Sequence, residues 1–192
     1  QAGESGYRYQ YIDVSLIESS RRAMITVRAP DDTPPAGVDA ILSRGAGWWP
    51  LQVARELDDA ILMLRTNHQS LGTWVLKTRG NPEHVQAADD SLHRQREHWF
   101  VRETLGMLRR TLARLEVTSR TLIALIESGS CFAGTLLEIA LAADRIYMQD
   151  SSQAAGNAPA VALSELNFGA FPRVDGRTRL AARFYDEAQA VT

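Results

Sequence analysis

Alternating apolar and polar residues mark the first elements of the chain. Residues 11–17 and 22–27 both follow a period of two, which is typical of a half-buried strand. Polar residues 18–21 lie between them and indicate a turn, so the two runs predict a hairpin. Three prolines and a glycine in residues 29–37 then predict a loop.

A helical period begins near Pro50, a residue that suits the first turn of a helix because its missing N–H costs nothing there. The apolar stripe of this helix comprises Val53, Leu57, Ile61 and Leu64. A second helix is predicted over residues 91–115, and a third, almost uncharged helix over residues 135–143 has Glu138 as its single acid.

Short apolar runs at residues 73–78, 122–126 and 145–148 predict strands between these helices. Alternation of strands and helices implies parallel strands joined by helical crossovers, so we expect a single α/β domain over residues 1–192. Residues 1–8 are expected to be a flexible start and residues 149–160 a mobile loop. The last part, residues 161–185, predicts a short strand, a loop and a basic helix.

Composition narrows the class of protein. The chain has 192 residues, of which 45% are hydrophobic and 23% charged, enough for an ordinary globular core. A net charge of -2 gives no basic face for nucleic acid, and no apolar run is long enough to span a bilayer. The single cysteine, Cys131, excludes an internal disulfide and favours a reducing, cytoplasmic location. The polar start without Met indicates a piece of a longer chain.

The strongest candidate for a functional site is the segment that runs from strand 122–126 through the turn 129–134 into the third helix. Backbone N–H groups at a helix start are unpaired and can bind an oxyanion that develops on a thioester carbonyl. Small residues in the turn let a ligand approach the backbone closely. The pattern by itself is also that of a simple tight connection between a strand and a helix.

Three segments in order resemble the crotonase (enoyl-CoA hydratase/isomerase) superfamily. They are the strand, turn and helix over residues 122–144, the strand and loop over residues 75–89 that ends Gln86-Ala87-Ala88-Asp89, and the run Ser164-Glu165-Leu166-Asn167-Phe168-Gly169 followed by Pro172. The resemblance covers about residues 10–182. It implies a crotonase-like ββα spiral fold, here without the helical tail that normally follows.

The resemblance also implies a site. Ala88 N–H with Gly134 or Thr135 N–H would form the oxyanion hole, and Glu138 with Glu165 would position water or move protons. The ligand would be a coenzyme A thioester, with no metal and no redox cofactor. Several glycines of the superfamily pattern are replaced, at Ala87, Ala133 and Thr135, and the turn is one residue longer. A decayed pocket, in which the two glutamates make structural hydrogen bonds, is the alternative.

A narrower resemblance is to benzoyl-CoA-dihydrodiol lyases. The matching runs are residues 48–61, 72–75, 98–104, 108–114, 129–135 and 163–169. For a whole enzyme it implies a carbon–carbon lyase that opens the ring of 2,3-epoxidised dihydrobenzoyl-CoA with release of formate. This chain resembles the second of two crotonase-like halves, so its implied partners are the N-terminal half and further copies in a homo-oligomer.

Three functions therefore stay open: a structural or supporting half of such a lyase, a stand-alone acyl-CoA hydratase or isomerase, and a non-catalytic interaction domain. A metal site is disfavoured because His93 and His98 are five residues apart, whereas ligands on one helix face are normally three or four apart. Cys131 is interpreted as a small buried thiol, and Trp48 and Trp49 as core or interface anchors. The basic residues Arg173, Arg177, Arg179 and Arg183 are expected to form a helix that contacts a partner half.

Overall fold

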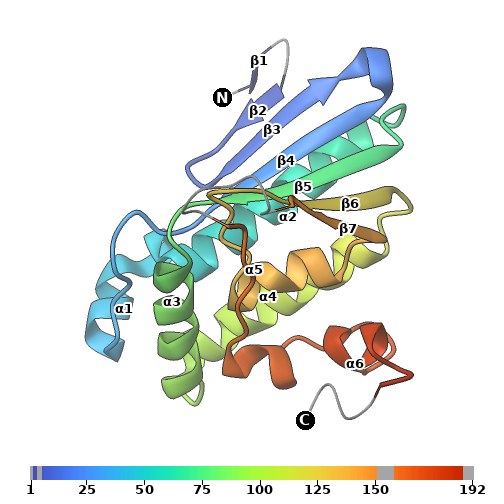
Figure 1. Ribbon diagram of the computed structural model, residues 1–192. Coiled ribbons are helices and arrows are strands. Elements are labelled where there is room, and N and C mark those ends of the chain that lie inside the picture. The colour runs from blue at the N-terminus through green and yellow to red at the C-terminus, as the bar shows by residue number, and fades with distance from the viewer. Residues whose placement is uncertain (1, 4–5, 151–157, 188–192) are drawn as a thin grey trace.

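A twisted sheet of seven strands forms the centre of the computed structural model, which describes residues 2–3, 6–150 and 158–187. The strands lie side by side in chain order (Figure 1). They are β1 (Ala2–Gly3), β2 (Gly6–Arg8), β3 (Ile12–Ile17), β4 (Arg22–Arg28), β5 (Thr73–Arg79), β6 (Thr121–Ile126) and β7 (Arg145–Met148). Neighbours from β1 to β4 are antiparallel and those from β4 to β7 are parallel. The predicted hairpin and α/β class are confirmed.

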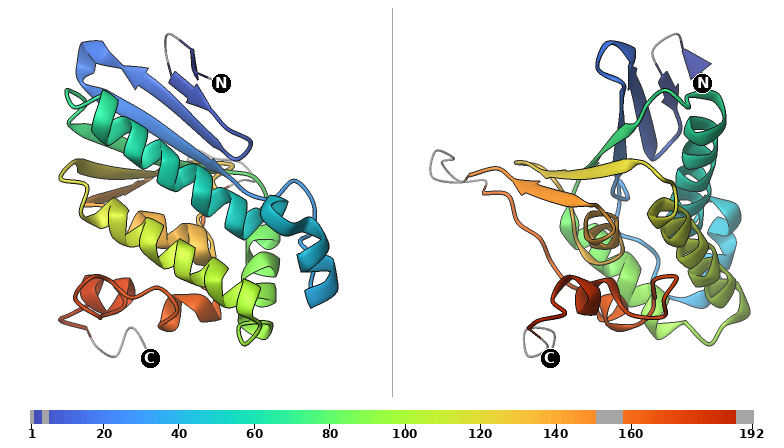
Figure 2. Two further views of the ribbon diagram at one scale, coloured as in Figure 1. Left: turned by 180° about the vertical axis from the view of Figure 1, so that it is seen from behind. Right: turned by 90° about the vertical axis from the view of Figure 1, so that its right-hand side faces the viewer.

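The helices that connect the parallel strands are α1 (Val38–Arg44), α2 (Trp49–Asn67), α3 (Pro82–Arg94), α4 (Trp99–Glu116) and α5 (Gly134–Leu141). The two longest, α2 and α4, lie side by side on one face of the sheet (Figure 2). Helix α6 (Arg179–Arg183) follows the last strand and packs on α5. Each step along the sheet adds one strand and its crossover, so the chain winds steadily in one direction. This winding is the crotonase-like spiral that the sequence predicted.

The single helix predicted over residues 91–115 is wrong, because two helices occupy this part of the chain. Asn81 caps α3 by accepting the Glu83 N–H at 2.9 Å, and Pro82 takes the first helical position. The break falls before α4, where the His98 side chain accepts the Phe100 N–H. Residues 82–90, which were read as a loop, are therefore helical. This shift places Ala88 inside a helix.

The start of the chain is more ordered than its sequence indicates. Within the expected flexible start, residues 6–8 form β2 and pair with β3. Arg28 holds the following turn by donating to the carbonyl oxygens of Tyr9 and Gln10. Helix α1 was also not predicted. Of the expected mobile loop at residues 149–160, residues 151–157 lie outside the described residues.

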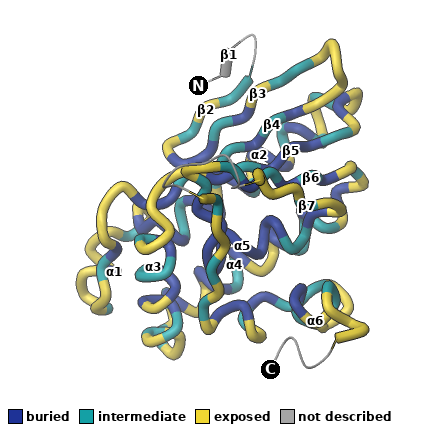
Figure 3. The backbone as a smooth tube through the Cα atoms, viewed as in Figure 1, coloured by how far each residue is buried: buried dark blue, intermediate teal, exposed yellow. Residues whose placement is uncertain are grey.

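The core lies between the sheet and the helices, where Figure 3 shows α5 and the inner strands as buried. One row of side chains across β4, β5 and β6 consists of Ala23, Trp74 and Leu122, and all three are buried. Trp48 and Trp49 are also buried, as expected for core anchors, and the Trp49 indole donates to the Arg28 carbonyl at 3.0 Å. No helix in the described part of the chain is long and apolar enough to cross a bilayer.

Truncation of the central tryptophan tests this core. We expect Trp74→Ala to lower the free energy of unfolding by about 3–5 kcal/mol, because it leaves a cavity among fully buried neighbours. Trp99, which is 59% exposed, provides the matched control, and Trp99→Ala should change stability by less than about 0.5 kcal/mol. Urea unfolding followed by circular dichroism measures both. Equal losses for the two variants would contradict this arrangement.

Candidate functional site

The start of α5 brings together most of the predicted site. Ala133 precedes the helix in an extended conformation, and Gly134 begins it with a φ of 45°. The Gly134 N–H donates to the Ala162 carbonyl at 2.9 Å. Ala162 also pairs with Ala133 in an isolated parallel bridge. The segment after residue 157 is therefore fastened directly onto the turn that was expected to receive a ligand.

The Asp89 carboxylate accepts the hydrogen bond of Thr135 N–H, another donor predicted for the oxyanion hole. Its Oδ2 accepts the Thr135 N–H at 2.7 Å and the Ser164 hydroxyl at 2.6 Å, while Oδ1 accepts the Thr135 hydroxyl. Asp89 lies at the end of the quoted Gln86–Asp89 motif and is only 1% exposed. The Asp89 carboxylate of the protein itself thus lies where the resemblance would put the thioester oxygen.

Burial controls the ionisation of Asp89. Removal of the side chain from water raises the pKa of its carboxyl group to about 6. The hydrogen bonds from Ser164 and Thr135 act in the opposite direction, since they stabilise the charged form. The carboxyl group is therefore largely ionised at neutral pH and able to receive all three donors.

Glycine is the only residue type that this arrangement accommodates at position 134. A Cβ atom there would overlap Asp89 Oδ2 and would come within 2.9 Å of the Ser164 hydroxyl oxygen. Its φ of 45° also lies in the left-handed region that favours glycine. The glycine kept from the superfamily pattern here makes room for an internal carboxylate.

Ala88, the third predicted donor, is not available either. It lies inside α3, where a backbone N–H is bonded to the carbonyl four residues earlier. Its side chain is fully buried in the core. The donors expected from Ala88, Gly134 and Thr135 therefore all have partners within the fold.

Glu138 is held in a buried ionic network. Its Oε2 accepts from Arg179 Nη1 at 2.9 Å, and its Oε1 accepts from the Asn167 amide at 2.6 Å. Both Glu138 and Arg179 have side chains that are 1% exposed. Burial raises the pKa of Glu138, whereas the Asn167 and Arg179 contacts oppose that rise. Arg179 also lies 2.6 Å from Glu116.

The structure does not bring Glu138 and Glu165 into one cavity. Glu165 is exposed at the start of the 3₁₀ helix Glu165–Phe168. Asn167, two residues further on, is the member of this helix that reaches Glu138. The Ser164 and Asn167 side chains complete a capping box that fixes the helix against α5.

Sequence reasoning missed the partners that decide the site: Asp89, Asn167 and Arg179. Asp89 and Asn167 stand inside motifs that were quoted, but exposed polar residues such as Asp90 and Glu165 lie beside them, so residue type alone did not single them out. Arg179 was expected to contact a partner half. Instead it is buried within this domain, because two carboxylates offset the cost of desolvating its charge.

The other two candidate sites, a reactive cysteine and a metal site, find no support among the described residues. Cys131 is fully buried, its N–H donates to the Thr78 hydroxyl at 2.9 Å, and burial raises the pKa of its thiol. A raised pKa disfavours the nucleophilic thiolate. Among the described residues, no group of His, Cys, Asp and Glu side chains is arranged to hold a metal ion.

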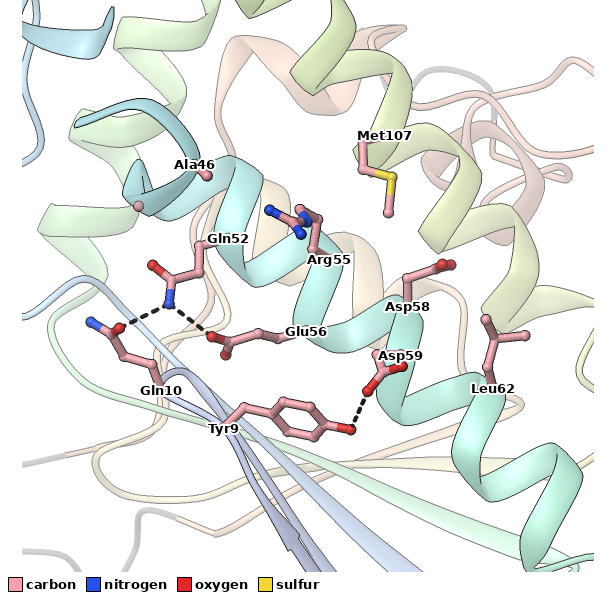
Figure 4. A pocket seen from close by; sticks show the side chains of 11 residues that line it. Tyr9, Gln10, Ala46, Gln52, Arg55, Glu56, Asp58, Asp59, Leu62 and Met107 are labelled. Carbon is pink, nitrogen blue, oxygen red and sulfur yellow. Dashed lines mark hydrogen bonds between the residues drawn. The ribbon is translucent and has the colours of Figure 1, made fainter. Parts of the chain in front are cut away.

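A separate cleft of about 750 Å³ lies on the outer surface of α2, away from the α5 turn. Figure 4 shows Gln52 between Gln10 and Glu56, and the Tyr9 hydroxyl donating to Asp59 at 2.7 Å. These contacts tie the turn after β2 to α2. The cleft contains none of the residues predicted for the site.

The raised pKa of Asp89 predicts a pH dependence of stability. Between about pH 4 and pH 6 the native carboxyl still holds a proton that an unfolded aspartate has lost, so the free energy of unfolding falls as the pH rises. For this one group the fall is up to about 3 kcal/mol. Asp89→Asn should remove that slope from the profile measured by urea unfolding.

The neighbouring Asp90 provides the control, since its side chain is 60% exposed and forms only a surface pair with Arg94. Asp90→Asn should keep most of the slope between pH 4 and pH 6, because the Asp90 charge raises the pKa of Asp89 less than burial does. An Asp89→Asn profile that overlays the parent profile would contradict the assigned ionisation.

Comparisons with known proteins show what the chain is similar to in sequence and in fold. No family model matches the chain. It is 54% identical over 188 residues to a benzoyl-CoA-dihydrodiol lyase of Aromatoleum evansii; the match covers 98% of the chain but 33% of that relative. The structure is similar to an enoyl-CoA hydratase of Geobacillus kaustophilus HTA426, with a TM-score of 0.59, 19% identity and coverage of 96% and 61% of the two chains. An enoyl-CoA hydratase of Bacillus anthracis gives a TM-score of 0.54, 18% identity and coverage of 94% and 60%.

The two hydratase structures are similar to the chain in fold, whereas the lyase of Aromatoleum evansii is similar to it in sequence. The chain spans one third of the length of the curated relative that it matches. The chain thus has the fold of the enoyl-CoA hydratases and is similar in sequence, over nearly its whole length, to one third of a benzoyl-CoA-dihydrodiol lyase.

Proposed function

We propose that this chain is a supporting, non-catalytic domain of a larger protein that acts as a benzoyl-CoA-dihydrodiol lyase. The observation that carries the proposal is the Asp89 carboxylate on the Thr135 N–H. That N–H is the donor which a thioester oxygen would need. A second observation is that Glu138, the candidate acid–base group, is buried in the core and paired with Arg179.

Hydrogen-bond strength favours the internal anion over a substrate. A carboxylate is a charged acceptor, and charge-assisted hydrogen bonds are roughly twice as strong as neutral ones. An uncharged thioester oxygen would have to displace Asp89 from three donors, and it would leave that carboxylate buried without them. Removing partners from a buried charge carries a large penalty. The closed turn is therefore expected to resist coenzyme A thioesters.

The activity proposed for the larger protein rests on the family resemblance of the sequence rather than on this site. In that proposal the protein opens the ring of 2,3-epoxidised dihydrobenzoyl-CoA and releases formate, as a cytoplasmic enzyme whose ligand is the coenzyme A thioester and which needs no metal or redox cofactor. This domain corresponds to the second of two crotonase-like halves. It packs on the N-terminal half and contributes to a homo-oligomer.

Titration with benzoyl-CoA tests the proposal. We expect isothermal calorimetry to give no saturable binding to this chain up to about 1 mM ligand, because the donors are already occupied. Free coenzyme A controls for contacts made by the nucleotide alone. Saturable binding that Glu165→Gln abolishes would instead favour a stand-alone acyl-CoA hydratase or isomerase that uses Glu138 and Glu165.

The two glutamates provide a matched pair for their roles. Glu138→Gln should lower the free energy of unfolding by about 3 kcal/mol or more, because it breaks a buried ion pair and leaves Arg179 with a poorer partner. Glu165→Gln alters an exposed side chain and should change stability by less than about 0.5 kcal/mol. Urea unfolding of both variants gives these values.

Turnover separates a structural role from a catalytic one. In a full-length lyase that contains this chain, Glu165→Gln should leave kcat within about twofold, whereas loss of a general acid or base typically costs 10²–10⁴-fold. A loss of that size with unchanged stability would show that Glu165 takes part in the reaction and would refute the supporting role.

A further inference from the structure

A second polar cavity, of about 420 Å³, lies where α6 packs beside the C-terminal ends of α4 and α5. Five charged residues line it: Glu116, Asp144, Arg173, Arg179 and Arg183. Arg179 also pairs with Glu138 of the site described above, whereas the other four residues belong neither to the turn at Gly134 nor to the Asp89 contacts. The cavity therefore adjoins that site, and a ligand in it would bind whether or not the domain is catalytic.

Arg179 presents an unpaired nitrogen in this cavity. Its Nη1 is bonded to Glu138 and to the Phe171 carbonyl, at 2.9 and 2.8 Å. The Arg179 side chain is only 1% exposed, so its Nη2 is buried, and this nitrogen has no hydrogen-bond partner among the described residues. Arg173 Nε also has no hydrogen-bond partner among the described residues, but it lies 3.9 Å from Asp175 and its side chain is 37% exposed. Two guanidinium donors are therefore left without acceptors.

An unpaired acceptor lies beside these donors. Glu116 Oε1 is 2.6 Å from Arg179 Nε, whereas Glu116 Oε2 is buried with no hydrogen-bond partner among the described residues. Buried polar groups without partners are costly, so such groups indicate a ligand or solvent that supplies the missing bonds. The missing partner has to accept from arginine and donate to a carboxylate.

Arg183 makes the cavity suitable for an anion. Carbonyl groups at the end of α5 would repel negative charge, but Arg183 Nη2 donates to the carbonyl oxygens of Leu141 and Ala143. Asp144 is also engaged, since it accepts the Leu122 N–H at 2.7 Å. The five lining groups carry a formal charge of +1, and two carboxylates outside the lining, Glu138 and Asp175, pair with Arg179 and Arg173.

We propose that this cavity binds a protonated tetrahedral oxyanion, namely the phosphate group of inorganic phosphate or of a phosphate monoester. Its oxygens would accept from Arg173 and Arg179, which suits the planar donors of guanidinium groups. A P–OH group would donate to Glu116 Oε2. Sulfate has the same shape but carries no hydroxyl group at neutral pH, so Glu116 repels it and selects phosphate.

Thermal unfolding and calorimetry at pH 6 test the selectivity. We expect 10 mM inorganic phosphate to raise the melting temperature of this chain and to bind at least tenfold more tightly than sulfate at matched ionic strength. Glu116→Gln keeps an acceptor for Arg179 and adds an amide donor, so it should bring sulfate and phosphate within about threefold of each other. Phosphate that gives no shift, or sulfate that matches phosphate in the unchanged chain, would overturn the proposal.

Arginine variants locate the site. Arg173→Gln should weaken phosphate binding at least fivefold. Arg102→Gln is the control, because Arg102 is 66% exposed at the far end of α4 and pairs with the exposed Glu103, and it should leave binding unchanged. Equal effects of the two variants would show only a general charge effect and would refute the site. Glycerol 3-phosphate distinguishes the source: tighter binding than inorganic phosphate identifies an ester group, and weaker binding identifies the free ion.

Discussion

The structure around the α5 turn depends on one buried carboxylate. Asp89 extends from α3 and bonds to the backbone and hydroxyl of Thr135 and to Ser164, so it joins three segments that are far apart in the chain. Because it is charged and sheltered from water, each of these bonds is strong. The same anion that assembles the turn also closes it to a neutral ligand.

A second ionic centre holds the C-terminal part of the domain in place. Arg179 enters the core from α6 and meets Glu138 of α5 and Glu116 of α4. Asn167 adds the preceding 3₁₀ helix to the same cluster. Such a cluster contributes less net stability than its short distances imply, because desolvation offsets much of the attraction. Its geometry is specific, however, and it fixes where the last helix lies.

Periodicity and turn residues predicted most of the fold, whereas the environment of the site lay beyond them. Strands β3 to β7 and helices α2 and α5 follow from local patterns that any reader of the sequence can check. The error at residues 91–115 arose because residues 93–98 contain no glycine or proline to mark the break, although Asn81 and Pro82 carry a clear signal for a helix start. Glu138 was correctly placed on α5, but its partner Arg179 is 41 residues away, a contact that no local pattern contains.

The absent side chain of Gly134 links two positions that are 45 residues apart. Since the Asp89 carboxylate fills the space that a Cβ would need, neither position can change freely while the other stays as it is. Opening the Thr135 donor therefore has to begin at position 89, where a smaller residue removes both the carboxylate and the overlap. A side chain introduced first at position 134 would overlap Asp89, and the φ of 45° there favours glycine in either case. The packing thus fixes which of the two positions can change first.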